Sequence, residues 1–269
     1  MFVNADMLLH QLPPLTEVEV VKRPSSVIKS PYVADVRFAD GRVGLCHTPG
    51  LGCCGLVEAG RRISVSLSKP GGSTKTECTA QIAHCADAEG VFYNGVHPMV
   101  SQSAARGLLP ILDADATWKT EVRIDDHTRI DFVGTRPDGK NVYVEVKNAM
   151  ISLETGKPRK ERKAVFPEGF RKKKDEPVSP RAVKHAQLLA ELVKKPETGA
   201  AYLLFTVPRT DCGDGMTINT RDPIYYAAVL AAIRAGVQVR AFALDFRLDG
   251  SVRLHKEVPF YINLATRTE

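Results

Sequence analysis

The 269-residue chain has no apolar run that approaches the roughly 20 residues a helix needs to cross a bilayer. Charged residues and prolines interrupt each of its hydrophobic stretches. The sequence therefore predicts no membrane partner.

Cysteine pairs of the C-x-x-C type are also missing, although the chain contains six cysteines. A cluster such as Cys78, His84 and Cys85 offers zinc-binding atoms, but its spacing matches no common zinc module. No secretory leader is recognisable, and unpaired thiols are typical of a reducing compartment. We therefore expect buried free thiols in an intracellular protein, cytoplasmic unless a basic cluster directs it to the nucleus.

The composition is that of a soluble globular protein, with 43% hydrophobic and 25% charged residues. The length leaves room for one large or two modest domains. A formal net charge of +6 favours a polyanionic partner such as nucleic acid. No pattern in the sequence indicates an oligomeric state.

Short β-like segments separated by glycine turns fill the first third of the chain. Residues 1–30 read as an N-terminal extension with room for one edge strand, and residues 31–88 contain several alternating segments. Turns at Asp40-Gly41 and Gly71-Gly72 are strong hairpin signals between such segments. This pattern predicts a small barrel or sandwich over 31–88, for which an oligonucleotide-binding (OB) barrel is one candidate.

Helices and apolar strands alternate through residues 89–269. Ser179-Pro180 is a helix start, with serine as the N-cap and proline at the first helical position. Asp222-Pro223 opens a second helix, which Gly236 ends, and the segment 237–246 is the last predicted strand. Together with the apolar strand AYLLFTV, these elements predict an α/β (α+β) fold with a mixed sheet flanked by helices.

An acidic hairpin lies at the centre of this region. The segment NVYVEVK alternates, which sets Glu145 and Lys147 on the face opposite its valines. The preceding turn, Arg136-Pro137-Asp138-Gly139, fits a type I turn that makes an antiparallel hairpin. In that hairpin, residues whose numbers sum to 276 lie opposite each other, so Asp131 faces Glu145 with Cβ atoms about 5 Å apart. A bulge would shift this register by one residue.

Two interpretations of these carboxylates remain open. Carboxylates this close repel each other, and a divalent cation between them removes the penalty. Alternatively, Glu145 and Lys147 belong to a half-exposed strand and are simply solvated. For Glu121 and His185 two alternatives are likewise open: each is either a surface residue or part of a functional site.

Basic residues follow the hairpin. Residues 157–174 form the most basic segment of the chain, and Arg181 and Lys184 follow it on the first predicted helix. The segment is consistent with a solvated loop, a nuclear-localisation-like cluster or a phosphate-binding arm.

An ordered set of segments extends over nearly the whole chain beyond Tyr32. They are YVADVRFADGR, HTPGLG and GLVEAGRRISVSLS in the first half, then TEVRIDDHTRIDF, VYVEVKN, AVFPEG, RAVKHAQLLAEL, LLFTVPRTD and DPIYYAAVLAAIRAGVQVRAFAL. This set resembles the sugar fermentation stimulation protein A (SfsA) family. The resemblance implies an OB-like, nucleic-acid-binding barrel followed, over 89–269, by a nuclease-like domain of the PD-(D/E)xK type.

The resemblance also implies which residues form the site, because the family's motif positions can be matched to this sequence. It makes Asp131 the motif aspartate, Glu145 and Lys147 the E-x-K pair, and Glu121 the acidic residue of the preceding strand. Asp131 and Glu145 would hold Mg²⁺ or Mn²⁺ through hard oxygen ligands. The nucleic-acid contacts we expect are Arg129, Arg171, Lys172, Lys173, Arg181, Lys184 and His185.

The sequence thus predicts a metal-dependent nuclease, with DNA favoured over RNA as the substrate. The alternative is a non-catalytic DNA-binding or regulatory protein that uses the nuclease fold as a scaffold. A pure binder has no reason to keep carboxylates beside polyanionic phosphate, and this favours the enzyme.

Overall fold

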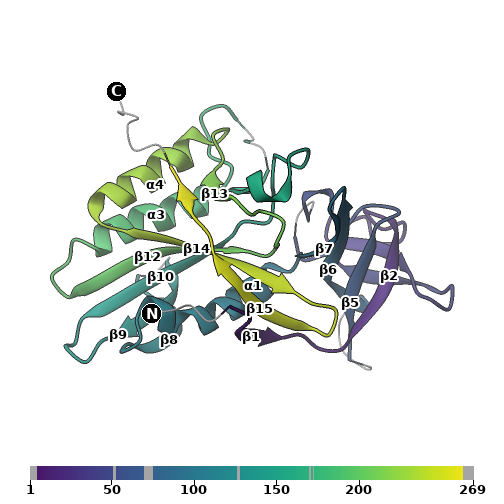
Figure 1. The fold of residues 1–269 in the computed structure, drawn as a ribbon, viewed down its shortest axis with the longest axis horizontal. Coiled ribbons are helices and arrows are strands. Elements are labelled where there is room, and N and C mark those ends of the chain that lie inside the picture. Colours follow the sequence, from purple (N-terminus) through teal and green to yellow (C-terminus); the bar gives the residue numbers. More distant parts are fainter. Residues whose placement is uncertain are drawn as a thin grey trace.

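Two β-sheets of different construction organise the protein, one on each side of Figure 1. The computed structural model describes residues 5–50, 53–69, 75–125, 128–169, 171 and 173–262. Within them, one sheet has six strands and the other has seven, accompanied by the long helices. A third sheet contains three short parallel strands, β11 (Lys163–Phe166), β13 (Gly215–Ile218) and β16 (Phe260–Tyr261). The fold is therefore of the α+β class.

The six-stranded sheet closes on itself. Its strands follow the order β4-β3-β2-β5-β6-β7, and β4 also pairs with β6, which closes five of them into a small barrel. Alternation turns one face of each strand inward, where apolar side chains such as Val20, Val36 and Ile63 are fully buried. The strands are β2 (Leu15–Lys22), β3 (Val33–Arg37), β4 (Val43–His47), β5 (Arg62–Leu67), β6 (Cys78–Asp87) and β7 (Gly90–Gly95), with a 3₁₀ turn η1 (Cys53–Gly55) between β4 and β5.

The N-terminal stretch is not an extension, contrary to the expectation for residues 1–30. Strand β2 lies between β3 and β5 inside the barrel sheet, because Val18 and Val20 alternate with polar residues and bury one face. Strand β1 (Leu8–Gln11) joins the edge of the seven-stranded sheet instead. Since β7 also pairs with β6, the six-stranded sheet spans residues 15–95 rather than 31–88.

The seven-stranded sheet is mixed, with the order β1-β15-β14-β12-β10-β9-β8. Its three central strands are parallel, and the strands outside them are antiparallel to their neighbours. The segment 237–246 is not the last strand, since β15 and β16 follow it. The remaining strands are β8 (Thr117–Arg123), β9 (Arg129–Thr135), β10 (Asn141–Asn148), β12 (Thr198–Val207), β14 (Gln238–Phe246) and β15 (Ser251–Glu257).

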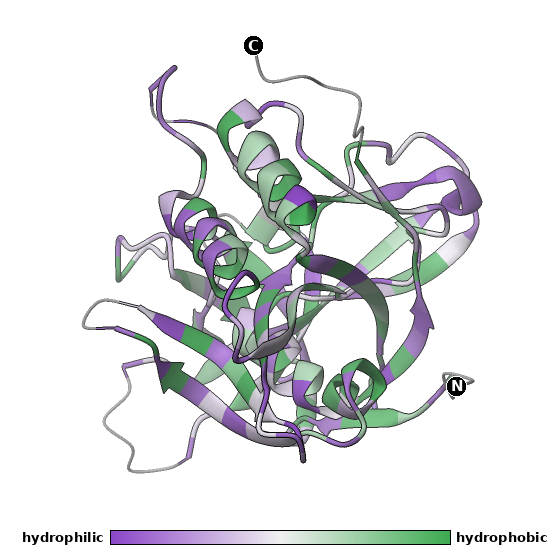
Figure 2. Ribbon diagram, turned by 90° about the vertical axis from the view of Figure 1, so that its left-hand side faces the viewer, coloured by the Kyte–Doolittle hydropathy of each residue, from purple (hydrophilic) through white to green (hydrophobic). Residues whose placement is uncertain are grey.

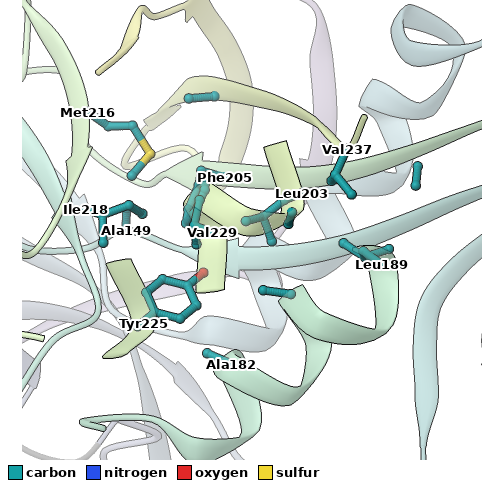
Figure 3. Packing of buried hydrophobic residues seen from close by; sticks show 14 of the residues in the cluster. Ala149, Ala182, Leu189, Leu203, Phe205, Met216, Ile218, Tyr225, Val229 and Val237 are labelled. Atoms are coloured by element: carbon teal, nitrogen blue, oxygen red, sulfur yellow. The ribbon is translucent and has the colours of Figure 1, made fainter. Parts of the chain in front are cut away.

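Helices cover both faces of this sheet (Figure 1). On one face, α3 (Pro180–Leu192) and α4 (Pro223–Ala235) pack on β12 residues such as Leu203 and Phe205, and Figure 3 shows this core from close by. On the other face, Tyr202 and Leu204 of the same strand contact a helical segment made of α1 (Pro98–Ala105), η2 (Arg106–Leu108) and α2 (Leu109–Leu112). A further 3₁₀ turn, η3 (Arg159–Glu161), precedes β11. Glu145 on the central strand β10 is therefore buried rather than solvated.

The two long helices begin where the sequence predicts. Ser179 Oγ accepts a hydrogen bond from the Ala182 N–H at 3.3 Å, and Asp222 Oδ1 accepts one from the Tyr225 N–H at 3.0 Å. Gly236 ends α4 with a φ of 109°, a conformation that glycine adopts without strain. Figure 2 shows hydrophobic and hydrophilic residues side by side along both helices. Among the residues that the structure describes, no helix has the length and apolarity to cross a membrane.

The barrel is held against the seven-stranded sheet by close packing and buried charge. A Cβ atom at Gly95 would lie 2.4 Å from the Phe246 ring, so this approach requires glycine. Asp87 accepts hydrogen bonds from Arg159 at 2.8 Å and Arg162 at 2.6 Å, and Arg162 also reaches Asp211 at 3.1 Å. This network fixes the barrel relative to the strands that carry the acidic residues.

Candidate functional site

The acidic hairpin has the predicted register. Gly139 N–H donates to the Arg136 carbonyl at 2.9 Å and closes the turn. The pairs run from Asn141 opposite Thr135 to Val144 opposite Phe132, each summing to 276. The ladder ends there, and Asp131 and Glu145 are the next residues along the two strands.

A third carboxylate lies in the same row across the sheet. On β8, Thr120 pairs with Phe132 and Val122 pairs with Ile130, which sets Glu121 opposite Asp131. Glu121 itself has a φ of 52°, so the ladder is locally distorted at this residue. Glu121, Asp131 and Glu145 thus occupy neighbouring positions on three adjacent strands.

Gln102 of α1 ties two of these carboxylates together. Its Nε2 atom donates to Glu121 Oε1 at 2.9 Å and to Asp131 Oδ1 at 2.6 Å. The second oxygen of Asp131 accepts the Val146 N–H at 2.7 Å. Sequence reasoning missed Gln102, because the periodicity of its helix is weak and only the tertiary fold brings α1 over the hairpin.

Glu145 is buried, with 2% of its surface exposed, so the solvated-strand interpretation is wrong. Its Oε1 atom contacts both Lys147 Nζ and His185 Nδ1, whereas its Oε2 atom is buried with no hydrogen-bond partner. On its other side, the His185 ring accepts a hydrogen bond from Arg181 Nε at 3.5 Å, and its Nδ1 atom also lies 3.3 Å from Lys147 Nζ. His185 thus serves to fix the Glu145 carboxylate.

Burial and charge shift the two facing carboxyl groups in opposite directions. Burial and the nearby charge of Glu145 raise the pKa of Asp131 to about 6, against the opposing effects of the Val146 N–H and Lys147. Burial acts to raise the pKa of Glu145, but the His185 hydrogen bond and the Lys147 charge hold it below its usual value. Close to neutral pH both groups are ionised and repel each other.

The carboxylates lie in a cleft of about 890 Å³ between the barrel and the seven-stranded sheet. Tyr32 on the barrel side and Met99 at the start of α1 line it with 43% and 59% of their surfaces exposed. Neither residue stood out in the sequence, because nothing local indicates that they meet. Other lining residues are Pro49, Gly50, Pro98, Gln102, Glu121, Asp131, Glu145, Lys147, Asn148, Phe166, Glu168, Ser179 and Arg181.

A second pocket, which we call the basic pocket, lies beside the cleft and shares Arg181 with it. It has a volume of about 490 Å³ and is lined by Arg123, Asp125, Thr128, Arg129, Pro180, Arg181, Lys184 and His185. Four of the predicted nucleic-acid contacts therefore meet in one place. His185 differs from the expectation, because it is only 4% exposed and its ring is held between Glu145 and Arg181.

Segment 157–174 lines the cleft with Phe166 and Glu168, but its described basic residues lie outside both pockets. Arg171 donates to the carbonyl of Lys174, and Lys173 forms a 2.9 Å ion pair with Glu176. Neither residue lines the cleft or the basic pocket. Lys172 lies outside the described residues.

The donor set of the cleft suits a hard divalent cation. Among the described residues, no three His, Cys, Asp or Glu side chains are gathered into a complete metal cage. The unpaired, buried Glu145 Oε2 and the facing Asp131 carboxylate nevertheless offer anionic oxygens in a place where their mutual repulsion is not otherwise relieved. Mg²⁺ and Ca²⁺ are commonly held by few carboxylates, with water or substrate oxygens completing the shell.

Comparison with known proteins identifies the family of this chain. The model of a family described as "Sugar fermentation stimulation protein RE domain" matches residues 96–250, which begin directly after β7. A sugar fermentation stimulation protein homolog of Halorhodospira halophila is 32% identical over 86% of this chain and 89% of its own length. The homolog of Methylobacterium nodulans is also 32% identical, over 91% of this chain and 96% of its own.

A solved structure has the same fold. The SfsA protein of Pyrococcus furiosus, described in complex with Ca²⁺, superposes with a TM-score of 0.73 and covers 95% of this chain and 100% of its own. Its sequence identity to this chain is 20%. From the matched domain and the curated relatives, the chain belongs to the sugar fermentation stimulation protein family.

Proposed function

We propose that this protein is a divalent-metal-dependent phosphodiesterase that hydrolyses nucleic acid, with DNA preferred over RNA. The observation that carries the proposal is the buried pair of Asp131 and Glu145, facing across two strands with Glu145 Oε2 unpaired and Lys147 beside them. The Ca²⁺ complex of the Pyrococcus furiosus relative supports the binding of a divalent cation.

The architecture supports the same function. A small closed barrel beside the cleft is consistent with an OB-like nucleic-acid-binding module. An antiparallel β8-β9-β10 meander followed by α3 and the parallel strand β12 is consistent with the PD-(D/E)xK core. In that core, the carboxylates and the lysine come from the second and third of these strands, as Asp131, Glu145 and Lys147 do.

Asp131 and Glu145 are the residues that would hold Mg²⁺ or Mn²⁺, and Glu121 is placed to add a carboxylate through its link to Gln102. When bound, the cation supplies Lewis-acid chemistry: it lowers the pKa of water and offsets charge on the phosphate. Both oxygens of Asp131 accept hydrogen bonds, which fixes the direction of the carboxylate.

Lys147 supplies positive charge at the floor of the cleft. Its ammonium contacts Glu145, and only 12% of the side chain is exposed, so the position of the ammonium is fixed. From this position it orients the attacking water or stabilises charge on the phosphate as it develops. His185 keeps Glu145 in place from behind by donating to Oε1.

Cleavage of plasmid DNA and of DNA and RNA oligonucleotides in Mg²⁺ and Mn²⁺ tests the proposal. We expect Asp131→Ala and Lys147→Ala to lose about 10² or more in rate, as when a group that stabilises transition-state charge is removed. Lys140→Ala is the matched control, because Lys140 is exposed in the hairpin turn and lines neither pocket. Equal cleavage by all four proteins would show that the site is elsewhere.

The competing function is non-catalytic nucleic-acid binding, which the basic pocket favours. Such a protein would bind with steep salt dependence and yield no product with any metal. The enzyme remains the better proposal because Asp131 and Glu145 would repel phosphate unless a cation lay between them.

A further inference from the structure

Basic side chains outnumber acidic ones among the described residues that line the basic pocket. Arg123, Arg129, Arg181 and Lys184 converge on it from the β8–β9 hairpin and from the first two turns of α3. Asp125 is the one acidic residue among the described residues of the lining. Arg129 and Lys184 are exposed, and within the described residues neither forms a hydrogen bond or ion pair through its side chain.

Elsewhere in the structure, arginine is usually paired with an acid. Arg136 contacts Asp113 at 2.6 Å, Arg209 contacts Asp211 at 2.6 Å, and similar pairs involve Arg37, Arg42, Arg62, Arg159, Arg162, Arg240, Arg247 and Arg253. Arg129 and Lys184 have no such partner within the described residues, and they lie in a concave place where converging like charges cost free energy. An anionic ligand would remove that cost.

The chemistry of the lining selects the class of anion. Guanidinium groups present several donors in a fixed plane that matches phosphate oxygens, and Lys184 adds a compact charge. The amino-terminal end of α3 lies at the same pocket and favours negative charge there. A volume of about 490 Å³ leaves room for a phosphate together with part of its sugar.

The basic pocket adjoins the cleft that contains the carboxylates. Arg181 lines both the basic pocket and the cleft, and its Nε atom holds the His185 ring that in turn fixes Glu145. A substrate chain that crosses from one pocket to the other therefore passes over Arg181. We propose that the basic pocket is a phosphate subsite, which binds a phosphate group of the substrate close to the phosphate that is cleaved. This inference rests on the proposed function for its substrate, but the anion binding itself does not require cleavage.

Two kinds of phosphate group could bind in this subsite: an internal phosphodiester or the terminal phosphate of a strand. A terminal phosphate carries more negative charge, and binding it would set the position of the cut relative to the end. Oligonucleotides with and without terminal phosphates distinguish these two kinds of phosphate group in one experiment.

The experiment measures binding of labelled 12-nucleotide single strands, without metal, in an Asp131→Asn background that cannot cleave. The strands carry a 5′-phosphate, a 3′-phosphate or neither, and a circular oligonucleotide provides internal phosphates alone. The test variant adds Arg129→Ala and Lys184→Ala, and Arg129→Gln with Lys184→Gln repeats it while retaining part of each side chain. The matched control adds Lys140→Ala and Lys195→Ala, which removes the same charge from exposed positions at the other end of β10 and α3.

We expect the test variants to bind at least tenfold more weakly than the control and to have a shallower salt dependence by about one unit of slope for each lost contact. Loss for every strand identifies an internal phosphate, whereas loss confined to one phosphorylated end identifies a terminal one. Equal affinity and slope in test and control would overturn the inference. If wild-type protein cleaves nothing while the test variants still lose binding, the phosphate subsite stands and the proposed hydrolysis fails.

Discussion

Asp131→Asn should stabilise the metal-free protein while removing its response to divalent cations. The folded protein raises the pKa of Asp131 from 3.8 to about 6, so folding favours the protonated, neutral group. Above pH 6 the ionised carboxylate is therefore a stability penalty, which fades as the pH falls and is absent below the unfolded pKa. The asparagine oxygen can accept the Val146 N–H, and Gln102 can turn its amide to meet the new NH₂ group.

The size of the effect follows from the shift. A rise of about two pKa units corresponds to at most about 3 kcal/mol at roughly 1.4 kcal/mol per unit. Because Asp131 is only partly buried, we expect Asp131→Asn to gain about 1–3 kcal/mol at pH 8 and nothing at pH 4. Urea unfolding at several pH values measures this difference.

The same titration is then repeated with Mg²⁺, Mn²⁺ or Ca²⁺. Wild-type protein should gain about 2.7 kcal/mol when the free cation is 100 times its dissociation constant, whereas Asp131→Asn should gain little. Asp138→Asn is the matched control, because Asp138 is exposed in the turn and an asparagine there can still accept the Lys140 N–H. A gain that is constant between pH 4 and 8, or a decrease in stability at pH 8, would refute the electrostatic reasoning.

Three further substitutions test separate parts of the structure. His185→Ala should weaken cation binding 10–100-fold by calorimetry, because Glu145 loses the group that orients it, and unchanged binding would exclude a positioning role. Gly95→Ala should cost about 1–3 kcal/mol in chemical unfolding, since its Cβ would lie 2.4 Å from the Phe246 ring; a neutral effect would mean that the barrel shifts freely. Asp222→Ala should lower stability by about 1–2 kcal/mol in chemical unfolding, because the Tyr225 N–H loses its cap, and an unchanged stability would argue against helix capping.

The sequence predicts those features that are encoded locally. The turn at 136–139 and the alternation of NVYVEVK suffice to set Val144 opposite Phe132, because hairpin register depends on the turn and on side-chain alternation. Helix starts at Ser179 and Asp222 are predictable for the same reason, since each cap bonds to a residue three positions ahead.

Features that depend on distant segments could not be predicted in this way. Strand β2 lies inside the barrel because it pairs with β5, more than 40 residues away, and no local signal distinguishes it from an edge strand. Gln102 reaches Asp131 only because α1 crosses the face of the sheet. The burial of Glu145 likewise depends on α3, which contributes His185 from 40 residues further along the chain.

The cost of the carboxylate pair is itself an argument for its use. A protein selected only for stability would replace Asp131 by an amide or apolar side chain, since a buried charge costs free energy unless it is paired. Here Asp131 is held by Gln102 and Val146 although its ionised form costs stability at neutral pH, and Glu145 is held beside it by His185 and Lys147. Strain of this kind persists at sites where a ligand relieves it. Between two carboxylates the ligand that does so is a cation, and the adjacent basic pocket then has a reason to bind the anion that the cation activates.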